Sequence, residues 1–302
     1  MNPRSVRHLA SALATLLAAT LLPAIAQPPA LAADRVGLVV KRQGDAVAVL
    51  PNTVGAASAA CRRGETLIGG GAITDGADFF GIFLRVSAPD PKNARRWIVR
   101  GFSNDSEDYR SLRAYAFCAR AAHKDRVGVI VRKRGTAKSV DPAVVQNVFA
   151  TCQRGETLVN GGALGTGAGR TAGVLLRASG PDPDKARRWF VKGYNNNVEE
   201  KRTMRAFAFC ARASSPDRVQ RIVKRAGPSV AVPGDGVADA FASCKRGEDL
   251  VGGGAFGTGT GYDGIFLQVS APDPNKARRW LARGANSSEE TEHVRAYAFC
   301  AR

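Results

Sequence analysis

Three pairs of arginines in this 302-residue chain each stand directly before a tryptophan. A guanidinium binds phosphate, sulfate or carboxylate through paired hydrogen bonds, and an indole provides a face on which a sugar ring or a base stacks. The three sets therefore predict a binding surface for an anionic polymer or glycan. The alternative is that each tryptophan anchors a hydrophobic core and the arginines lie at the rim of its strand. The sets are Arg95, Arg96 and Trp97; Arg187, Arg188 and Trp189; and Arg278, Arg279 and Trp280.

A second basic strip lies upstream of each set, at the end of a predicted strand. If the two strips lie on one face, the chain would present the same cationic surface three times. The residues of this strip are Lys41 and Arg42; Arg132, Lys133 and Arg134; and Lys224 and Arg225.

Six acidic residues recur with the same spacing, so a hydrolase has to be considered. Two carboxylates can perform glycoside hydrolysis, but three identical active sites in one short chain would be unusual. An aspartate between two prolines is typical of a turn, and a glutamate after Arg-Gly is expected to pair with a nearby arginine. Beyond the N-terminal leader the histidines are His123 and His293, which form no Ser-His-Asp or Cys-His set. We therefore predict no catalytic residue, no enzymatic activity and no cofactor. The six acids are Glu65, Glu156, Glu248, Asp90, Asp182 and Asp273.

A run of glycines follows a predicted strand in each copy of this pattern. Successive amide groups in such a run can form a nest that binds an anion. Neither a P-loop nor a dinucleotide-binding motif follows, however. We therefore favour the interpretation that these are β-bulges, or places where the backbone approaches a neighbour closely. The runs are Gly69, Gly70 and Gly71; Gly161 and Gly162; and Gly252, Gly253 and Gly254.

All these motifs recur because the chain contains three tandem copies of one unit, at residues 34–120, 125–212 and 217–302. Each copy begins with Asp-Arg-Val, contains Cys-x-Arg-Gly-Glu and Pro-Asp-Pro, and ends with Phe-Cys-Ala-Arg. The linkers, at 121–124 and 213–216, are so short that neighbouring copies are expected to touch or nearly touch.

Each copy carries two cysteines at the same positions, which is typical of a disulfide framework in an exported protein. Six cysteines permit fifteen pairings, and the repeat symmetry favours one bond within each copy. Each such bond closes a loop of roughly 57 residues, which is expected to stabilise the fold by about 4 kcal/mol. No metal site is predicted, because Cys-x-x-Cys is absent and two unmatched histidines cannot complete a zinc site. The predicted disulfides are Cys61–Cys118, Cys152–Cys210 and Cys244–Cys300.

Short segments rich in Val, Ile, Phe and Ala, separated by Gly, Pro, Asn or Asp, predict β-strands. No long stretch keeps a helical apolar period, although residues 142–150 and 237–243 are compatible with a helical turn. The chain is therefore predicted to be all-β. The strands predicted in the first copy are 36–41, 46–50, 66–70, 81–86, 97–102 and 112–118.

Two arrangements of the copies are compatible with this pattern. Short linkers favour a prism-like pseudo-threefold assembly with one shared core. A private disulfide in each copy favours three small β-sandwiches in a row, each with a core of its own. We favour the prism.

Residues 1–33 have the features of a Sec-type signal peptide and short leader. Arg4 and Arg7 precede an uncharged segment rich in Ala and Leu, which small-x-small tripeptides follow. The alternative is a membrane anchor, but Pro23 interrupts the segment and it lacks the roughly 20 apolar residues of a span. We therefore expect a secreted, extracellular bacterial protein with no transmembrane segment after cleavage.

The chain has a formal net charge of +18 at pH 7, and loss of the leader would remove two arginines and no acid. Strong positive charge outside the cell indicates anionic partners such as wall polymers, acidic glycans or lipid headgroups, with nucleic acid less favoured. The alternative is that the charge mainly keeps a Gly- and Ala-rich protein soluble.

The order of the motifs resembles a module of secreted proteins from actinobacteria and other bacteria. The shared pattern is Cys-x-x-Gly-Glu-x-Leu-x-Gly-Gly-Gly-Ala, then Ser-x-Pro, a Trp, an Asn-rich loop and Ala-Tyr-Ala-x-Cys-Ala. The resemblance covers nearly the whole chain after the leader, and it implies neither an assigned activity nor catalytic residues. This chain departs from the pattern after the first cysteine, where Arg62, Gln153 and Lys245 replace a frequent Pro. A looser resemblance, to vitelline outer-layer prism proteins, rests on three β repeats with Cys-x-x-Gly and Trp, and implies contact with carbohydrate.

The leading hypothesis is a secreted, non-catalytic binding protein for anionic surface polymers or glycans, multivalent through its three copies. The alternative is a structural or protein-partner component of a cell envelope, coat or secreted assembly, in which the charge is incidental.

Overall fold

The computed structural model describes residues 39–76, 78–120, 130–167, 173–212 and 222–302, and these residues form strands, turns and loops without a helix. The predicted signal peptide, both linkers and the first residues of each copy lie outside the described residues. No helix in the described part of the chain is long and apolar enough to cross a membrane.

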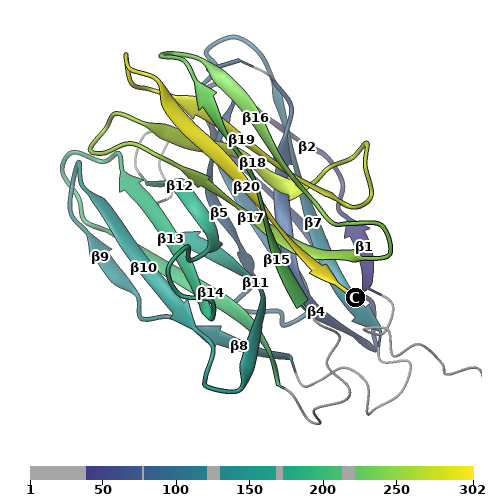
Figure 1. Ribbon diagram of the computed structural model, residues 1–302. Coiled ribbons are helices and arrows are strands. Elements are labelled where there is room, and N and C mark those ends of the chain that lie inside the picture. The colour runs from purple at the N-terminus through teal and green to yellow at the C-terminus, as the bar shows by residue number, and fades with distance from the viewer. Residues whose placement is uncertain (1–38, 77, 121–129, 168–172, 213–221) are drawn as a thin grey trace, which may run out of the picture. The chain divides into compact units, whose positions relative to one another are not determined.

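Each copy contributes a similar succession of strands (Figure 1). The first copy forms β1 (Val39–Gln43), β2 (Val47–Val49), β3 (Val54–Ala60), β4 (Glu65–Thr74), β5 (Ile82–Pro89), β6 (Arg96–Ser103) and β7 (Arg110–Arg120). The second forms β8 (Ile130–Arg134), β9 (Lys138–Val140), β10 (Val145–Thr151), β11 (Glu156–Gly165), β12 (Val174–Pro181), β13 (Arg188–Asn195) and β14 (Arg202–Arg212). The third forms β15 (Ile222–Val232), β16 (Val237–Ser243), β17 (Asp249–Gly257), β18 (Ile265–Pro272), β19 (Arg279–Asn286) and β20 (Glu292–Ala301).

The strand predictions were right in kind and incomplete in number. All six strands predicted in the first copy overlap an observed strand, but β3 was missed, because its alanine-rich sequence contains a single β-branched residue, Val54. The predicted helical turns at 142–150 and 237–243 were wrong. The second of these segments is strand β16, and most of the first belongs to β10. Pairing with β13 and β19 stabilises the extended conformation there, so tertiary contacts override a weak local preference.

Each of the three sheets takes its strands from two different copies. The 1–2 sheet has the order β3-β6-β5-β11-β14-β8, with β9 also paired to β14. The 2–3 sheet has the order β10-β13-β12-β17-β20-β15. The 3–1 sheet has the order β16-β19-β18-β4-β7-β1, with β2 also paired to β7. Every copy therefore places some of its strands in a sheet shared with the preceding copy and the others in a sheet shared with the following copy.

This exchange closes on itself, because the third copy pairs back onto the first. The joins between copies are short: β5 meets β11 at Ser87↔Ala163, β12 meets β17 at Ser179↔Ala255, and β18 meets β4 at Ser270↔Ala72. The fold is thus the prism-like assembly around a pseudo-threefold axis. In three separate sandwiches, by contrast, every sheet would contain strands of one copy only.

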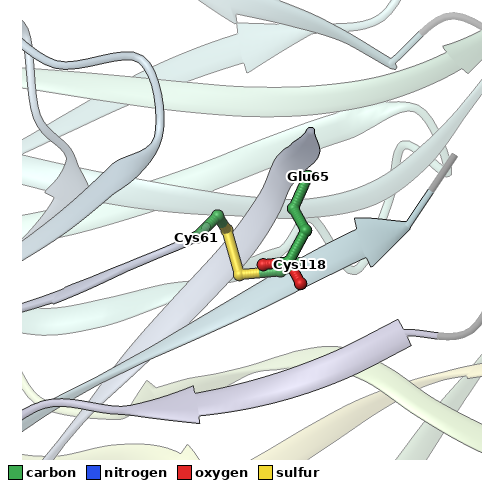
Figure 2. A group of neighbouring side chains, drawn as sticks. All are labelled: Cys61, Glu65 and Cys118. Carbon is green, nitrogen blue, oxygen red and sulfur yellow. A yellow bond between two sulfur atoms is a disulfide. The ribbon is translucent and has the colours of Figure 1, made fainter. Parts of the chain in front are cut away.

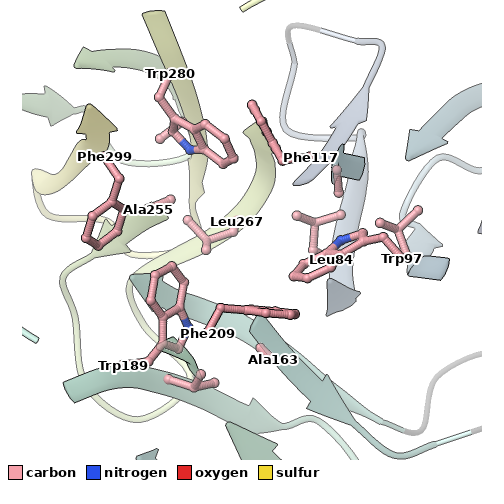
Figure 3. Packing of buried hydrophobic residues seen from close by; sticks show 14 of the residues in the cluster. Leu84, Trp97, Phe117, Ala163, Trp189, Phe209, Ala255, Leu267, Trp280 and Phe299 are labelled. Atoms are coloured by element: carbon pink, nitrogen blue, oxygen red, sulfur yellow. The ribbon is translucent and has the colours of Figure 1, made fainter. Parts of the chain in front are cut away.

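The shared core is built around the three tryptophans (Figure 3). Each indole packs against a phenylalanine of the next copy, with ring centroids 6.2 Å apart for Trp97–Phe209, 6.2 Å for Trp189–Phe299 and 5.9 Å for Trp280–Phe117. The core therefore interlocks the copies in the same cyclic order as the sheets.

The glycine runs let the indoles approach the backbone. A Cβ atom on Gly70 would lie 2.3 Å from the ring of Trp97, and the equivalent positions Gly161 and Gly253 meet Trp189 and Trp280 in the same way. No side chain fits there, so close packing explains why a glycine recurs at this position in all three copies.

The turns that follow the first cysteine of each copy all lie at one end of this assembly. Residues 62–64 lead from the 1–2 sheet to the 3–1 sheet, residues 153–155 from the 2–3 sheet to the 1–2 sheet, and residues 245–247 from the 3–1 sheet to the 2–3 sheet. We call this the cystine end. The opposite end, the loop end, carries the connections β4–β5, β6–β7 and β2–β3 and their equivalents in the other copies.

Candidate functional site

The cystine end is held by the three disulfides, which pair as predicted. They join Cys61 to Cys118, Cys152 to Cys210 and Cys244 to Cys300. Cys61 follows β3 of the 1–2 sheet, whereas Cys118 lies in β7 of the 3–1 sheet. Each disulfide therefore connects two different sheets at a corner of the assembly, and such bonds are compatible with an extracellular protein.

A buried glutamate lies beside each disulfide, as Figure 2 shows for Glu65 next to Cys61 and Cys118. This group does not suit a metal ion, because both sulfur atoms are in a disulfide and are not thiolate ligands. The carboxylate instead accepts a hydrogen bond of 2.7 Å from Nε of Arg42 and one of 2.8 Å from the backbone N–H of Arg62. Glu65 thus fixes the turn and the first basic strip together.

The other two copies repeat this arrangement. Nζ of Lys133 lies 3.4 Å from Glu156, and Nε of Arg225 lies 2.7 Å from Glu248. Hydrogen bonds from Arg225 and the backbone of Lys245 outweigh burial, so that the pKa of Glu248 is lowered to about 2. The recurrent glutamates therefore act as partners of the basic strip.

The three tryptophans of the predicted binding motif lie inside the core. Trp97, Trp189 and Trp280 are exposed by only 0%, 1% and 1%. Each indole Nε1 donates a hydrogen bond to a serine Oγ on the adjacent strand, as for Trp97 and Ser87 at 3.1 Å. The tryptophans therefore lie where the alternative interpretation put them, as anchors of the hydrophobic core. Their rings offer no stacking face at the surface.

The second arginine of each pair is tied into the fold. Arg96, Arg188 and Arg279 form ion pairs with the buried Asp90, Asp182 and Asp273. Burial raises the pKa of Asp90, but hydrogen bonds from the backbone of Lys92 and from Arg96 more than offset it, so the pKa is lowered overall. The three aspartates therefore anchor the second arginines through ion pairs.

The first arginine of each pair lies at the surface, and Nη1 of Arg278 donates a hydrogen bond of 3.5 Å to the carbonyl of Lys245. Arg95, Arg187 and Arg278 are exposed, and no described residue forms an ion pair with them. The carbonyl of each accepts a hydrogen bond of 2.9 Å from the backbone N–H of the first cysteine of its copy, which holds it beside the cystine-end turn.

Further exposed cations surround these three arginines. Some of them lie in the sharp turns after the first cysteines, where Gly64, Gly155 and Gly247 have φ angles of 83°, 81° and 84° that glycine adopts without strain. The others lie in the turns β5–β6, β12–β13 and β18–β19. We call the whole set the cationic ring. It consists of Arg62, Arg63, Lys92 and Arg95; Arg154, Lys185 and Arg187; and Lys245, Arg246, Lys276 and Arg278.

The two basic strips meet across the copies. Nη1 of Arg132, in the second copy, donates a hydrogen bond of 3.3 Å to the carbonyl of Asp90 in the first copy. Nζ of Lys224, in the third copy, donates a hydrogen bond of 3.3 Å to the carbonyl of Asp182 in the second copy. The strip of one copy therefore lies next to the Asp–Arg pair of the preceding copy.

The loop end has a different surface. Acidic side chains gather in its loops, and the most exposed large apolar side chains of the described residues lie there too. The acids include Asp75, Asp78, Glu107, Asp108, Asp141, Glu199, Glu200, Asp235, Asp263, Glu289 and Glu290. The apolar side chains are Leu50, Phe80, Tyr109, Val144, Val198 and Tyr262.

Three buried polar residues near the loop end escaped the sequence interpretation. Arg85, Arg177 and Gln268 occupy the bulge positions of β5, β12 and β18. Each side chain reaches the loop of the next copy that corresponds to the β4–β5 connection. Nη2 of Arg177, for example, donates a hydrogen bond of 2.6 Å to the carbonyl of Tyr262. Burial lowers the pKa of both arginines to about 10. An arginine inside an otherwise apolar strand was the signal that could have revealed them.

No known protein-family model matches this chain, and no curated protein matches it significantly. Its class is therefore defined by its fold: an all-β protein of three disulfide-stapled repeats that exchange strands around a pseudo-threefold axis.

Proposed function

We propose that this is a secreted, non-catalytic protein that binds anionic surface polymers or glycans through the cationic ring. The observation that carries the proposal is the position of Arg95, Arg187 and Arg278, which are exposed, fixed at the backbone and without an ion-pair partner among the described residues. A polymer that touches several copies at once gains affinity from each additional contact.

The recurrent carboxylates support a binding function over a catalytic one. Glu248 and Asp90 are both bound by arginines, and hydrogen bonds hold their pKa values low. A general acid needs a raised pKa, so these groups are poorly suited to glycoside hydrolysis. Secretion rests on the leader sequence and agrees with the three disulfides.

The test compares two triple variants on immobilised heparin. Arg95→Ala, Arg187→Ala and Arg278→Ala together remove three charges from the cationic ring. Arg113→Ala, Arg205→Ala and Arg295→Ala remove three charges from equivalent positions of β7, β14 and β20 nearer the loop end, and serve as the matched control.

We expect the first triple variant to elute at markedly lower salt. The slope of log affinity against log salt concentration should decrease in magnitude by roughly two to three, since about one counterion is released per neutralised charge. The control should elute close to the unmodified protein. Equal retention of the first variant and the unmodified protein would contradict the proposal.

A second candidate function is a structural or protein-partner role at the loop end. The exposed Phe80, Tyr109 and Tyr262 among acidic loops favour it, because aromatic side chains are enriched at protein interfaces. A protein that co-purifies in stoichiometric amount at high salt would support this function, since polyanion binding weakens steeply there.

A further inference from the structure

The three copies differ at one position on the outer face of their edge strands. Phe149 of β10 and Phe241 of β16 lie under the guanidinium groups of Arg188 and Arg279, with Cζ 4.1 and 4.0 Å from the ring centroids. The register places these rings opposite the residue that follows each tryptophan. In the first copy the same register position, opposite Ile98, is occupied by Ser58.

A second difference lies two residues away on the same strands. In the third copy Asp239 accepts hydrogen bonds of 2.6 and 2.9 Å from Arg283. In the first copy the matching pair is Ala56 opposite Arg100. Arg100 is exposed, and no described residue forms an ion pair with it. The first copy therefore lacks both the ring and the carboxylate that the third copy supplies from its own edge strand.

These two differences leave an open groove beside β3 and β6. Its volume is about 350 Å³, and its lining includes Ala56, Ser58, Arg96, Ile98 and Arg100. The side chain of Arg96 is 42% exposed there, against 21% for each of its equivalents under a phenylalanine. We call this the Arg96 groove. Its volume is at the lower end of the range of small-molecule sites.

We propose that the Arg96 groove binds a small aromatic compound that carries an anionic group. The ring lies under Arg96, where the other two copies hold a phenylalanine, and the anion meets Arg100, where the third copy holds an aspartate. Cation–π attraction and a charge-assisted hydrogen bond then recognise the two halves of the ligand.

The site is independent of the cationic ring. Arg96 and Arg100 belong to β6 on the outer face of the 1–2 sheet, and neither is a member of that set. Asp45 also lines the groove, and its negative charge opposes an anionic ligand. Asp45→Asn is therefore expected to strengthen binding.

The experiment measures binding of 4-phenylbutyrate to the full protein by ligand-observed NMR. Two analogues serve as controls: 4-cyclohexylbutyrate keeps the charge without the aromatic ring, and 4-phenylbutan-1-ol keeps the ring without the charge. We expect 4-cyclohexylbutyrate to bind about two- to fivefold more weakly, as the loss of an exposed cation–π contact predicts. We expect the alcohol to bind more weakly still.

Substitutions then locate the site. Ser58→Phe should fill the groove as in the other copies and weaken binding at least tenfold without lowering the melting temperature. Arg100→Ala should weaken binding of 4-phenylbutyrate but not of the alcohol. Phe149→Ser should create a second binding site next to Arg188.

The proposal is wrong if Ser58→Phe binds 4-phenylbutyrate as well as the unmodified protein, or if the cyclohexyl analogue binds equally well. The triple variant at Arg95, Arg187 and Arg278 should keep full binding of 4-phenylbutyrate. If that variant loses heparin retention but keeps 4-phenylbutyrate binding, the result bears on the proposed function and not on the Arg96 groove.

Discussion

A buried carboxylate beside each disulfide links the charge of this protein to its stability. Glu248 is 1% exposed and receives hydrogen bonds from Arg225 and from Arg302, the latter at 2.8 Å. Its pKa lies at about 2, below the ordinary value of 4.5, so the folded state holds the ionised form more strongly than the unfolded chain does.

The pH dependence of unfolding follows from this shift. The contribution of Glu248 to stability is complete above pH 4.5 and is lost as the pH falls towards 2. We expect Glu248→Gln to lower the melting temperature by several degrees at pH 7 and to have little effect near pH 2. Thermal unfolding at a series of pH values measures this. Glu107→Gln, at an exposed position of the loop end, is the control. A difference that stays constant across the series would contradict the ionic role.

At the scale of the strands, the disulfides act between sheets. The bond between Cys61 and Cys118 joins the end of β3, in the 1–2 sheet, to β7, in the 3–1 sheet. β3 is an edge strand that is rich in alanine, so its own side chains give it limited packing energy. The disulfide therefore holds an element that the hydrophobic core secures only in part.

Removal of this disulfide should destabilise the fold chiefly by releasing a constraint on the unfolded chain. The sequence separation of 57 residues corresponds to about 4 kcal/mol of loop-closure entropy in the unfolded chain. We expect Cys61→Ser with Cys118→Ser to lower the free energy of unfolding by about that amount, measured by denaturant titration. The equivalent double substitution at Cys152 and Cys210 should cost a similar amount, since its loop has nearly the same length. A loss below roughly 1 kcal/mol would contradict the loop-closure expectation.

At the scale of the whole assembly, the pseudo-threefold axis is filled by one asymmetric residue. Gly69, Asn160 and Gly252 occupy equivalent positions of β4, β11 and β17, and their Cβ positions converge. A Cβ on Gly69 would lie 1.7 Å from Nδ2 of Asn160, and one on Gly252 would lie 2.4 Å from it. A single side chain therefore excludes any side chain at the other two positions.

This crowding makes Gly69 and Asn160 energetically coupled. We expect Gly69→Ala to destabilise the protein by about 1–3 kcal/mol, as overpacking of a core does. Asn160→Gly should relieve the clash, so the double variant should be more stable than the sum of the two single effects predicts. A double-mutant cycle in denaturant measures the coupling. Additive effects would contradict the steric explanation.

Much of the fold could be predicted because the repeats carry strong local signals. Cysteine positions fixed the disulfides, since symmetry left one natural pairing, and the Val- and Ile-rich segments marked most strands. β3, β10 and β16 were missed because they are edge strands, whose conformation depends on the strand that they pair with. The sequences of these segments do not identify that partner strand.

The binding residues were predicted only in part for a related reason. Arg95, Arg96 and Trp97 are neighbours in sequence, yet they have three different environments: exposed, ion-paired and buried. Strand alternation and the nearby turn separate them, and sequence alone does not place a residue at the rim or the interior of a sheet. The Arg96 groove was missed because it forms where Ser58 replaces the phenylalanine of the other two copies, Phe149 and Phe241.

The sequence by itself determined that three tandem copies of a disulfide-stapled β unit carry a strongly basic charge, because composition, spacing and repetition are properties of the chain. The tertiary structure decided that the copies exchange strands, that the tryptophans interlock the core, and that the first arginine of each pair gathers at the cystine end. Those features depend on contacts between residues far apart in the chain, whose geometry arises only when the three sheets close around the axis.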